Sequence, residues 1–463
     1  MTLIVETPGT HPAERDYILG VILGDFLGIS WQRAASTDGD AHLRLRGDDS
    51  EIVLPDIFFS QSDPAWLTAA TLPRLPLATW GTRELAVNIS LTEPVVPVIC
   101  GAAHPILRRS GQTIELPIDI FGSAFFMLSR YEEAILPDRD NHNRFPAMAS
   151  LANRAGFLGR PIVDEYVEVL WAAMQQLWPS LKRKPRAPRT LVSHDVDCPS
   201  RDVFASPFQV LLRSGADLLK RRDLANAVRR PWRWIASGQR IRGSDPDNTF
   251  DWLMDQSEHH GLTSAFYFMS RRTHARFDVG YRLEHPAIRQ LLRHIHVRGH
   301  EIGLHPSYNS YHNPLTIEAE ATRLKGVCAE EGIEQAEWGG RMHYLRWEMP
   351  TTLLGLEQAG MTYDSTLSYA DRPGFRCGTC HEYPAFDPVR SQALKLRIRP
   401  LIAMECTVMA ERYMGLGTTA AAYEAFMKLK RACETVDGDF TLLWHNTQLA
   451  SPQERELYQA IIV

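Results

Sequence analysis

A short β-prone run that ends in two carboxylates constrains this chain more than any other segment. Residues 190–197 read Thr-Leu-Val-Ser-His-Asp-Val-Asp. Alternate residues of a strand share a face, so Asp195 and Asp197 can point in the same direction. Two neighbouring carboxylates repel each other, and a bound cation is the usual remedy. The pattern indicates either an active site at the carboxyl end of a strand or an Asp-rich turn that caps a following helix.

Four further polar clusters follow predicted strands. They are centred on His305, Arg341, Asp364 and His445. Each residue taken alone has an ordinary structural interpretation, such as a loop histidine or a surface ion pair. Five clusters in series, however, suit a barrel whose active site lies on the rim formed by the strand ends.

Strand-like and helix-like patterns alternate between residues 248 and 463. Glycines at positions 261, 332 and 360 follow predicted helices, as expected for helix stops. The alternation predicts parallel strands with outer helices. We therefore expect an α/β fold in which residues 188–463 form a distorted (β/α) barrel. Residues 394–408 are predicted to hold one or two of its strands.

A basic, proline-rich segment at residues 180–189 is typical of a linker between domains. The region before it, residues 1–187, is predicted to be a smaller, mixed α/β domain. A hairpin is expected at residues 45–55, and helices are expected over residues 118–133 and 161–178. The sequence assigns no chemistry to this domain, and its polar helical residues are expected to be structural.

Taken in order, the motifs resemble those of the polysaccharide deacetylase family (carbohydrate esterase family 4, the NodB-homology domain). The resemblance covers residues 188–463. The five motifs correspond to Asp195-Val196-Asp197, His305, Arg341-Met342-His343-Tyr344, Asp364-Ser365 and Leu443-Trp444-His445. Residues 1–187 resemble an uncharacterised domain that precedes some deacetylase domains.

The resemblance implies a division of catalytic labour. Asp195 is expected to be the general base, and Arg341 is expected to hold its carboxylate. His445 is expected to protonate the departing nitrogen, and Asp364 to orient that histidine.

A divalent metal is also implied, most of all zinc, with nickel, cobalt and manganese as alternatives. Asp197, His305 and Asn309 are the expected ligands. Asn309 stands where the family has a second histidine, and an amide oxygen is a poorer zinc ligand than imidazole. The third ligand therefore stays open between Asn309, His312 and another residue. His343 stands where the family's third motif has proline.

Substrate contacts are expected from Tyr344, Trp444 and Arg376, with the Tyr344 backbone N–H as the oxyanion donor. Nearby, Cys377 and Cys380 form a Cys-x-x-C pair. This pair has three interpretations: half of a zinc site, a redox pair, or a loop beside the active site.

The composition and net charge limit which classes of binding partner and which cellular compartment we expect. The net charge is −5 and the pI about 6.4, so nucleic-acid binding is not favoured. The first residues do not read as a secretory signal, and no apolar run approaches the ~20 residues that span a bilayer. Seven scattered cysteines fit reduced thiols. We expect a cytoplasmic protein, and the sequence leaves its oligomeric state undetermined.

Residues 199–245 lack the alternating strand and helix pattern that predicts the barrel. Between positions 199 and 243 there are ten basic and three acidic residues, together with Trp232, Trp234 and several leucines. Such a basic helical insertion can lie on an anionic membrane. Alternatively, the insertion is a solvated helical segment that packs on the barrel or forms a lid over it.

The expected activity is metal-dependent removal of an N-acetyl group from an amino sugar in an oligosaccharide, polysaccharide or glycan precursor. Hydrolysis of a small non-sugar amide on the same fold is one alternative. A catalytically degenerate, glycan-binding protein is the other, motivated by Asn309.

Overall fold

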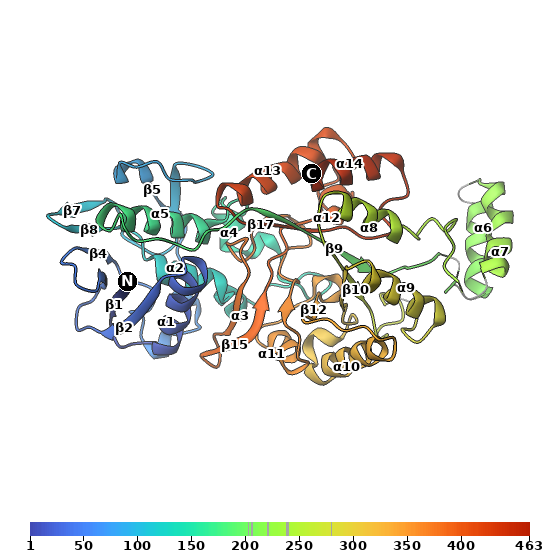
Figure 1. Ribbon diagram of the computed structural model, residues 1–463, viewed down its shortest axis with the longest axis horizontal. Coiled ribbons are helices and arrows are strands. Elements are labelled where there is room, and N and C mark those ends of the chain that lie inside the picture. Colours follow the sequence, from blue (N-terminus) through green and yellow to red (C-terminus); the bar gives the residue numbers. More distant parts are fainter. Residues whose placement is uncertain (202, 205–206, 220–221, 238–239, 279) are drawn as a thin grey trace.

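Two separate sheets organise the chain, as the computed structural model shows (Figure 1). The structure describes residues 1–201, 203–204, 207–219, 222–237, 240–278 and 280–463. All strands of the six-stranded sheet lie before residue 116, and all strands of the nine-stranded sheet lie after residue 188. The basic, proline-rich segment predicted as a linker runs between them.

The first sheet is mixed and has the strand order β2-β1-β3-β4-β8-β7. Its hairpin of β3 and β4 is antiparallel and turns at residues 46–50, where a hairpin was expected. The strands are β1 (Thr2–Thr7), β2 (Ser30–Ala35), β3 (Ala41–Leu45), β4 (Glu51–Leu54), β7 (Arg108–Ser110) and β8 (Thr113–Glu115), with β5 (Ala78–Gly81) and β6 (Val95–Val98) paired apart from them.

Helices cover this sheet and face the second one. They are α1 (Pro12–Leu19), which continues as a π-helix (Gly20–Phe26), α2 (Ile120–Leu128), α3 (Tyr131–Ile135), α4 (Leu151–Arg154) and α5 (Ile162–Leu177). The helix predicted over residues 118–133 is broken in two because Arg130 takes a left-handed conformation with φ of 53°. α5 buries the apolar face that its sequence pattern predicts.

The second sheet is a curled half-barrel with the order β14-β15-β13-β12-β11-β10-β9-β17-β16. All neighbours pair in parallel except β14 and β15, and no pairing between described residues closes β14 onto β16. The α/β class is therefore confirmed, with a barrel that stays open at one seam. The strands are β9 (Arg189–Val196), β10 (Ser264–Phe268), β11 (Glu301–Leu304), β12 (Gly339–Gly340), β13 (Tyr363–Asp364), β14 (Tyr383–Asp387), β15 (Gln392–Ile398), β16 (Ala403–Met404) and β17 (Asp439–Leu443).

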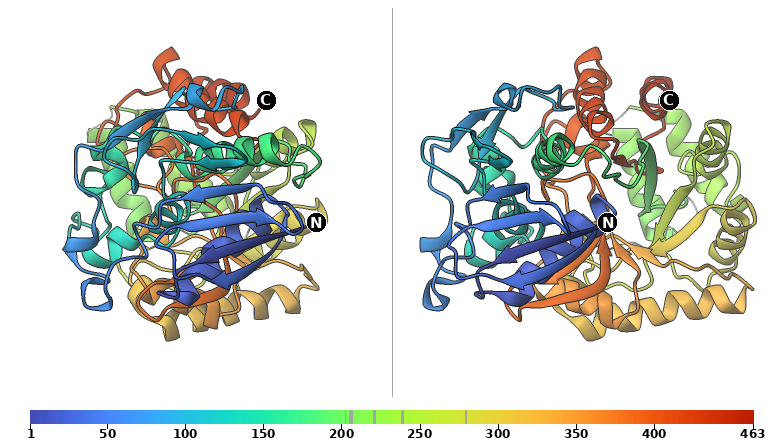
Figure 2. Two further views of the ribbon diagram at one scale, coloured as in Figure 1. Left: turned by 90° about the vertical axis from the view of Figure 1, so that its left-hand side faces the viewer. Right: turned by 60° about the vertical axis from the view of Figure 1, so that its left-hand side comes forward.

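Helices lie along the outside of the curled sheet (Figure 2). Because both faces are covered, β10 and β17 are buried at every residue. Inside the curl, a Cβ on Gly339 would lie 1.9 Å from the Tyr363 ring, so only glycine fits there. The helices are α8 (Phe250–His259), α9 (Pro286–Val297), α10 (Pro314–Glu330), α11 (Thr351–Gln358), α12 (Glu405–Met409), α13 (Ala420–Thr435) and α14 (Pro452–Ile462). The strand expected to reach residue 408 ends at Met404, where α12 begins.

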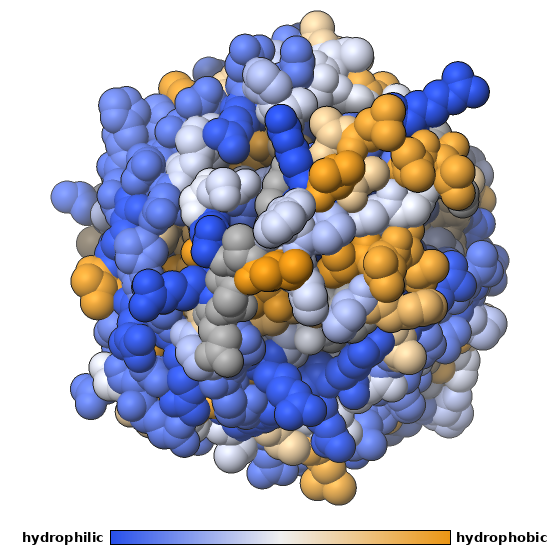
Figure 3. All heavy atoms as spheres, turned by 90° about the vertical axis from the view of Figure 1, so that its right-hand side faces the viewer, coloured by the Kyte–Doolittle hydropathy of each residue, from blue (hydrophilic) through white to orange (hydrophobic). Residues whose placement is uncertain are grey.

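A helical hairpin leaves the barrel between β9 and α8. It consists of α6 (Pro207–Leu219) and α7 (Leu224–Ser237), at the end of the molecule far from the first sheet (Figure 1). Apolar side chains gather on this end (Figure 3). Parts of the predicted insertion, residues 202, 205–206, 220–221 and 238–239, lie outside the described residues. No helix in the described ranges is long and apolar enough to cross a membrane.

A buried charge network joins the two sheet-bearing regions. Glu133 accepts hydrogen bonds from Arg376 at 2.5 and 2.9 Å and from Arg130 Nε at 2.9 Å. Arg130 also donates to the Arg376 carbonyl. Burial alone would raise the pKa of Glu133, but the two guanidinium groups outweigh it and lower the pKa to about 2. Arg376 is thereby a structural residue of the interface, not the substrate contact that was expected.

We expect Glu133→Gln to destabilise the protein by about 3–5 kcal/mol, because it leaves the buried Arg376 without its carboxylate partner and leaves Arg130 with Glu132 alone. Chemical denaturation monitored by circular dichroism measures the change. Glu284→Gln removes one partner of the exposed Arg323 pair and is the matched control, with an expected effect below about 1 kcal/mol. Equal effects of the two substitutions would contradict a special role for the network.

Candidate functional site

Three potential metal ligands converge at the carboxyl edge of the curled sheet. Asp197 follows β9, His305 follows β11 and His343 follows β12. Asp197 Oδ1 lies 3.4 Å from His305 Nε2 and 3.6 Å from His343 Nε2. All three donor atoms lie within 4.8 Å of one another. The parallel strands explain the convergence, since their carboxyl ends share one edge.

Both histidines are oriented by their second ring nitrogen. His305 Nδ1 lies 2.6 Å from the Arg341 carbonyl oxygen, and His343 Nδ1 lies 3.1 Å from an Asp278 carboxylate oxygen. Both partners accept hydrogen bonds, so each Nδ1 carries a proton, and Nε2 is the ring nitrogen left to bind a cation. Histidine ligands in metal sites are typically held in this way.

The donor set fits a divalent cation. Asp197 Oδ1 and His305 Nε2 are buried and make no hydrogen bond to any described residue. Buried polar atoms without partners are costly, and a cation between them would satisfy both. Two imidazoles and one carboxylate are a donor set found in catalytic zinc sites and in other divalent metal sites.

Asn309 is not part of this group, contrary to the expectation. Its Oδ1 accepts from Arg346 at 3.2 Å, and its Nδ2 donates to the Thr273 carbonyl at 3.3 Å. His312 is exposed at the end of a short turn and also lies outside the group. His343 takes the place because its backbone N–H donates to Pro306, which brings it beside the end of β11. The departure from the third motif, histidine for proline, was the signal that could have identified it.

The electrostatics of the group favour the ligating form of the carboxylate. Burial alone would raise the pKa of Asp197, but His343, His305 and His445 outweigh it and lower the pKa well below its usual range. The pKa of Asp278 is likewise lowered, to about 2, because its hydrogen bonds to His343 and to three backbone N–H groups outweigh burial.

Asp195 is fixed at the edge of the ligand group by Arg341. Arg341 Nη1 donates to Asp195 Oδ1 at 2.9 Å, while Asp195 Oδ2 lies 3.8 Å from His305 Nε2. The guanidinium is fully buried and also donates to Ser193 and Ser365. The geometry matches the contact expected between Arg341 and Asp195.

His445 lies on the opposite side of Asp197, with its Nε2 3.7 Å from Asp197 Oδ2. Its Nδ1 lies 2.6 Å from Glu405 Oε1, at the start of α12. Burial alone would lower the pKa of His445, but Glu405 and Asp197 outweigh it and raise the pKa to about 10. The ring is therefore held as an imidazolium that faces the ligand group.

Asp364 does not orient His445, contrary to the expectation. Its Oδ1 accepts from the backbone N–H of Thr366 at 2.9 Å and from the hydroxyl of the same residue. Burial raises the pKa of Asp364 to about 6. Glu405 occupies the position beside His445 instead. Sequence reasoning missed Glu405 because residues 394–408 read as strand, so no motif marked it.

A cleft of about 170 Å³ opens over these residues. Its further lining includes Arg144, Tyr344, Leu345, Met404, Arg412 and Tyr413. Of the three expected substrate contacts, only Tyr344 lines it. Trp444 is fully buried, packs against Phe426 and Tyr458, and donates from Nε1 to the Gln448 carbonyl at 2.8 Å.

Arg144 brings the first region of the chain into the cleft. Its Nη1 donates to the Tyr344 carbonyl at 3.1 Å and its Nε donates to Asp140 at 2.8 Å. Its Nη2 lies 3.4 Å from the Tyr413 hydroxyl. Sequence analysis assigned no chemistry to residues 1–187, yet one cationic wall of the cleft comes from them.

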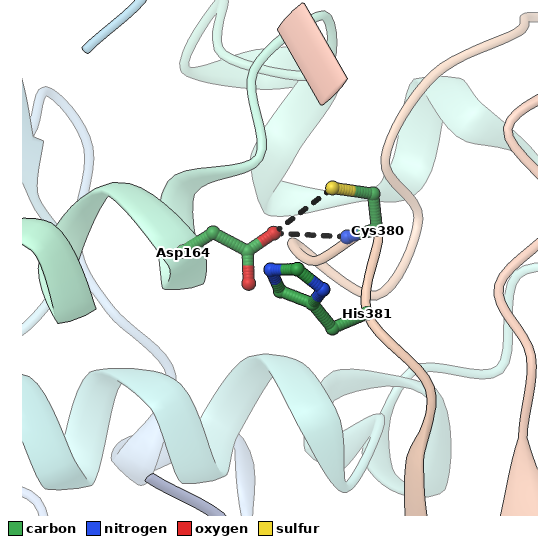
Figure 4. A group of neighbouring side chains, drawn as sticks. All are labelled: Asp164, Cys380 and His381. Atoms are coloured by element: carbon green, nitrogen blue, oxygen red, sulfur yellow. Dashed lines mark hydrogen bonds between the residues drawn. The ribbon is translucent and has the colours of Figure 1, made fainter. Parts of the chain in front are cut away.

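The segment from Cys377 to Cys380 lies against α5, at the interface with the first region. Asp164 accepts from the Thr379 hydroxyl at 2.6 Å. It also accepts from the Cys380 N–H and thiol, at 2.9 and 3.3 Å (Figure 4). These hydrogen bonds account for the proximity of Asp164, Cys380 and His381. Both cysteines are free thiols. Burial raises the pKa of the Cys380 thiol, so the protonated donor form is favoured and the cluster serves as a structural clasp.

Comparisons with known proteins assign no chemistry to this chain. A family of unknown function (DUF7033) matches residues 3–179. No curated protein matches the chain. A solved structure described as a polysaccharide deacetylase from Mycobacterium smegmatis is similar with a TM-score of 0.38 and 17% identity, over 60% of this chain and 84% of that chain. Another, described as Puue allantoinase, gives 0.31 and 13%, over 60% and 86%. At these distances the chemistry has to come from the site itself.

We expect His343→Ala to lower the affinity for zinc or cobalt by at least about 100-fold, because it removes a ligand rather than an outer partner. Asn309→Ala is the matched control and should keep one metal ion per chain. Asp278→Asn should fall between the two, with a loss of about 10–100-fold. Metal titration of stripped protein, with elemental analysis, measures all three. A loss of metal from Asn309→Ala that equals the loss from His343→Ala would contradict the assignment.

Proposed function

We propose that the protein is a metal-dependent amide hydrolase that removes an N-acetyl group from an amino sugar. One observation carries the proposal. The three-donor group of Asp197, His305 and His343 is flanked by the carboxylate of Asp195 and by the imidazole of His445. Amide hydrolysis needs this pairing of an acceptor and a donor of protons around an electrophilic centre.

Asp197, His305 and His343 would hold the cation. A divalent ion bound there supplies Lewis-acid polarisation of the amide carbonyl and acidifies a water molecule. Asp195, held by Arg341, accepts the proton of the attacking water as its oxygen bonds to the carbonyl carbon. The His445 imidazolium, held by Glu405, donates a proton to the nitrogen as the carbon–nitrogen bond breaks. The products are a carboxylic acid and a free amine, so the atoms and protons balance.

The cleft supports an acetylated sugar as substrate. Leu345 and Met404 are buried apolar residues in its lining, and they suit the methyl group of an acetyl. Arg144, Arg412 and Tyr413 supply the polar groups that hydroxyl-rich rings require. The motif resemblance of residues 188–463 supports the same class, whether the sugar belongs to an oligosaccharide, a polysaccharide or a glycan precursor.

A small non-sugar amide is the second candidate. The cleft volume of about 170 Å³ favours it, because that space holds one small molecule without a sugar chain. The argument for a degenerate, glycan-binding protein rested on Asn309 as a poor ligand. It is weakened because His343 offers a donor atom beside Asp197 and His305. Metal-loaded protein incubated with N-acetylated amino-sugar oligomers should release acetate. Release of ammonia or of another acid from ureides or imides would favour the small-amide candidate.

We expect Asp195→Asn to reduce turnover by about 10²–10⁴-fold and to leave the metal bound, because it removes the proton acceptor but no ligand. Acetate release and metal content are measured on the same preparation. Glu318→Gln, an exposed carboxylate on α10, is the control and should match the wild type in both. Full activity of Asp195→Asn would refute the assigned base.

Glu405→Gln should move the alkaline limb of the kcat/KM profile to lower pH. The carboxylate of Glu405 raises the pKa of His445, so the protonated donor persists to higher pH in the wild type. Removal of that charge lowers the pKa, and the donor is lost earlier as pH rises. Asp364→Asn is the control, since Asp364 contacts Thr366 instead. An identical shift in both variants would show that the effect is not specific to the Glu405 contact.

A further inference from the structure

The α6–α7 hairpin exposes an unusual amount of apolar surface. Nine of the nineteen large apolar side chains that are exposed in the described part of the chain lie on it. Leu219 is 80% exposed, Trp232 is 70% exposed and Phe208 is 69% exposed. Figure 3 shows apolar side chains gathered on this end of the molecule in neighbouring groups, with paler residues between them and hydrophilic residues around them. Patches of this kind mark interaction sites in soluble proteins.

The exposed residues form one stripe on each helix. In α7 they are Leu224, Val228, Trp232 and Ile235, spaced four, four and three residues apart. This spacing places them on one face of a helix. In α6 the corresponding residues are Phe208, Leu211, Leu212, Leu218 and Leu219.

The two helices of the hairpin meet at a buried ion pair, while their apolar stripes face outward. Asp217 and Arg230 form an ion pair of 2.6 Å between the helices, with side chains only 2% and 12% exposed. In water the hydrophobic effect favours the opposite arrangement, with apolar stripes together and charges outside. The hairpin therefore presents its apolar faces to something other than water.

The charge of the segment indicates what kind of surface the apolar stripes contact. Residues 199–243 carry ten basic and three acidic side chains, a net charge of +7, while the whole chain carries −5. The remainder is therefore acidic and is repelled by an anionic surface. This segment combines a cluster of exposed apolar residues with an excess of positive charge, so this end of the molecule is the one attracted.

We propose that the α6–α7 hairpin docks the protein on an anionic membrane surface. Its apolar stripes, with Trp232, enter the interface, and its basic residues contact the headgroups. A second copy of the chain is a poorer occupant, because two surfaces of charge +7 would repel each other. A nucleic acid would account for the charge but not for the apolar stripes.

The insertion that carries the hairpin begins and ends at the rim that carries the proposed active site. Ser200 donates to Asp245 at 2.5 Å, and Arg201 pairs with Asp247, so the two ends of the insertion are clamped together. Asn446 donates to the Cys198 and Asp247 carbonyls, both at 2.8 Å. Cys198 and Asn446 directly follow Asp197 and His445 in the chain. Docking therefore holds the rim at the membrane; that this brings hydrolysis to a membrane-borne substrate rests on the proposed function, whereas docking itself does not.

Vesicle co-sedimentation of the full, metal-loaded protein tests the proposal. Phosphatidylcholine vesicles that contain one third phosphatidylglycerol should bind it at least about tenfold more tightly than vesicles of phosphatidylcholine alone. Binding should weaken as salt is raised, because the headgroup contacts are screened.

The double variant Leu219→Asp, Trp232→Asp should lose vesicle binding by at least about tenfold, because it places charge in both apolar stripes. Leu315→Asp is the matched control, since Leu315 is 75% exposed on α10, outside the hairpin, and it should bind like the wild type. Circular dichroism and metal content should be unchanged in both variants, which separates docking from folding and from the ligand group.

Several outcomes would overturn the proposal. They are a wild type that stays in the supernatant, equal binding to both vesicle types, and equal losses in the control. Sedimentation equilibrium adds another: a wild-type dimer that the double variant splits, without vesicle binding, would make the stripes a self-association surface. An inactive but vesicle-bound protein would refute the proposed function and leave docking intact.

Discussion

The buried guanidinium of Arg341 is the contact on which the site depends. Its side chain holds Asp195 at 2.9 Å, while its own carbonyl oxygen holds His305 Nδ1 at 2.6 Å. One residue thus orients both the proposed base and a proposed ligand. The guanidinium also stacks over Tyr267, with 4.8 Å to the ring centroid, inside the curl of the sheet. A fully buried cation is tolerated there because a carboxylate, two serines and an aromatic ring surround it.

The first region of the chain completes the cleft rather than standing apart from it. Arg346 donates to the His142 carbonyl at 2.7 Å and stacks between the rings of Tyr308 and Tyr311. His142 in turn contacts the Tyr308 hydroxyl at 2.8 Å. Arg144 lines the cleft, and these contacts hold the segment around it against the barrel. The first region therefore contributes directly to the wall of the cleft.

Local patterns predicted the elements well, because each depends on nearby residues. The periodicity of α5 and the turn between β3 and β4 are both local features. The convergence of Asp195, Asp197, His305, Arg341 and His445 was also predicted, because parallel strands bring their carboxyl ends to one edge. The failures share a cause. Asn309 and Asp364 were chosen by their order along the chain, whereas the ligating and orienting positions depend on distances across it.

The sequence by itself determined the α/β class, the strand-end clusters and the basic insertion, since these follow from residue type and short-range spacing. Only the tertiary structure placed His343 beside Asp197 and His305, Glu405 against His445, and Arg376 in an interface with Glu133. The physical reason is that a contact between distant residues depends on the register of several strands and on the path of the loops between them. The same holds for the hairpin: its apolar residues were visible in the sequence, but folding alone showed that they face outward.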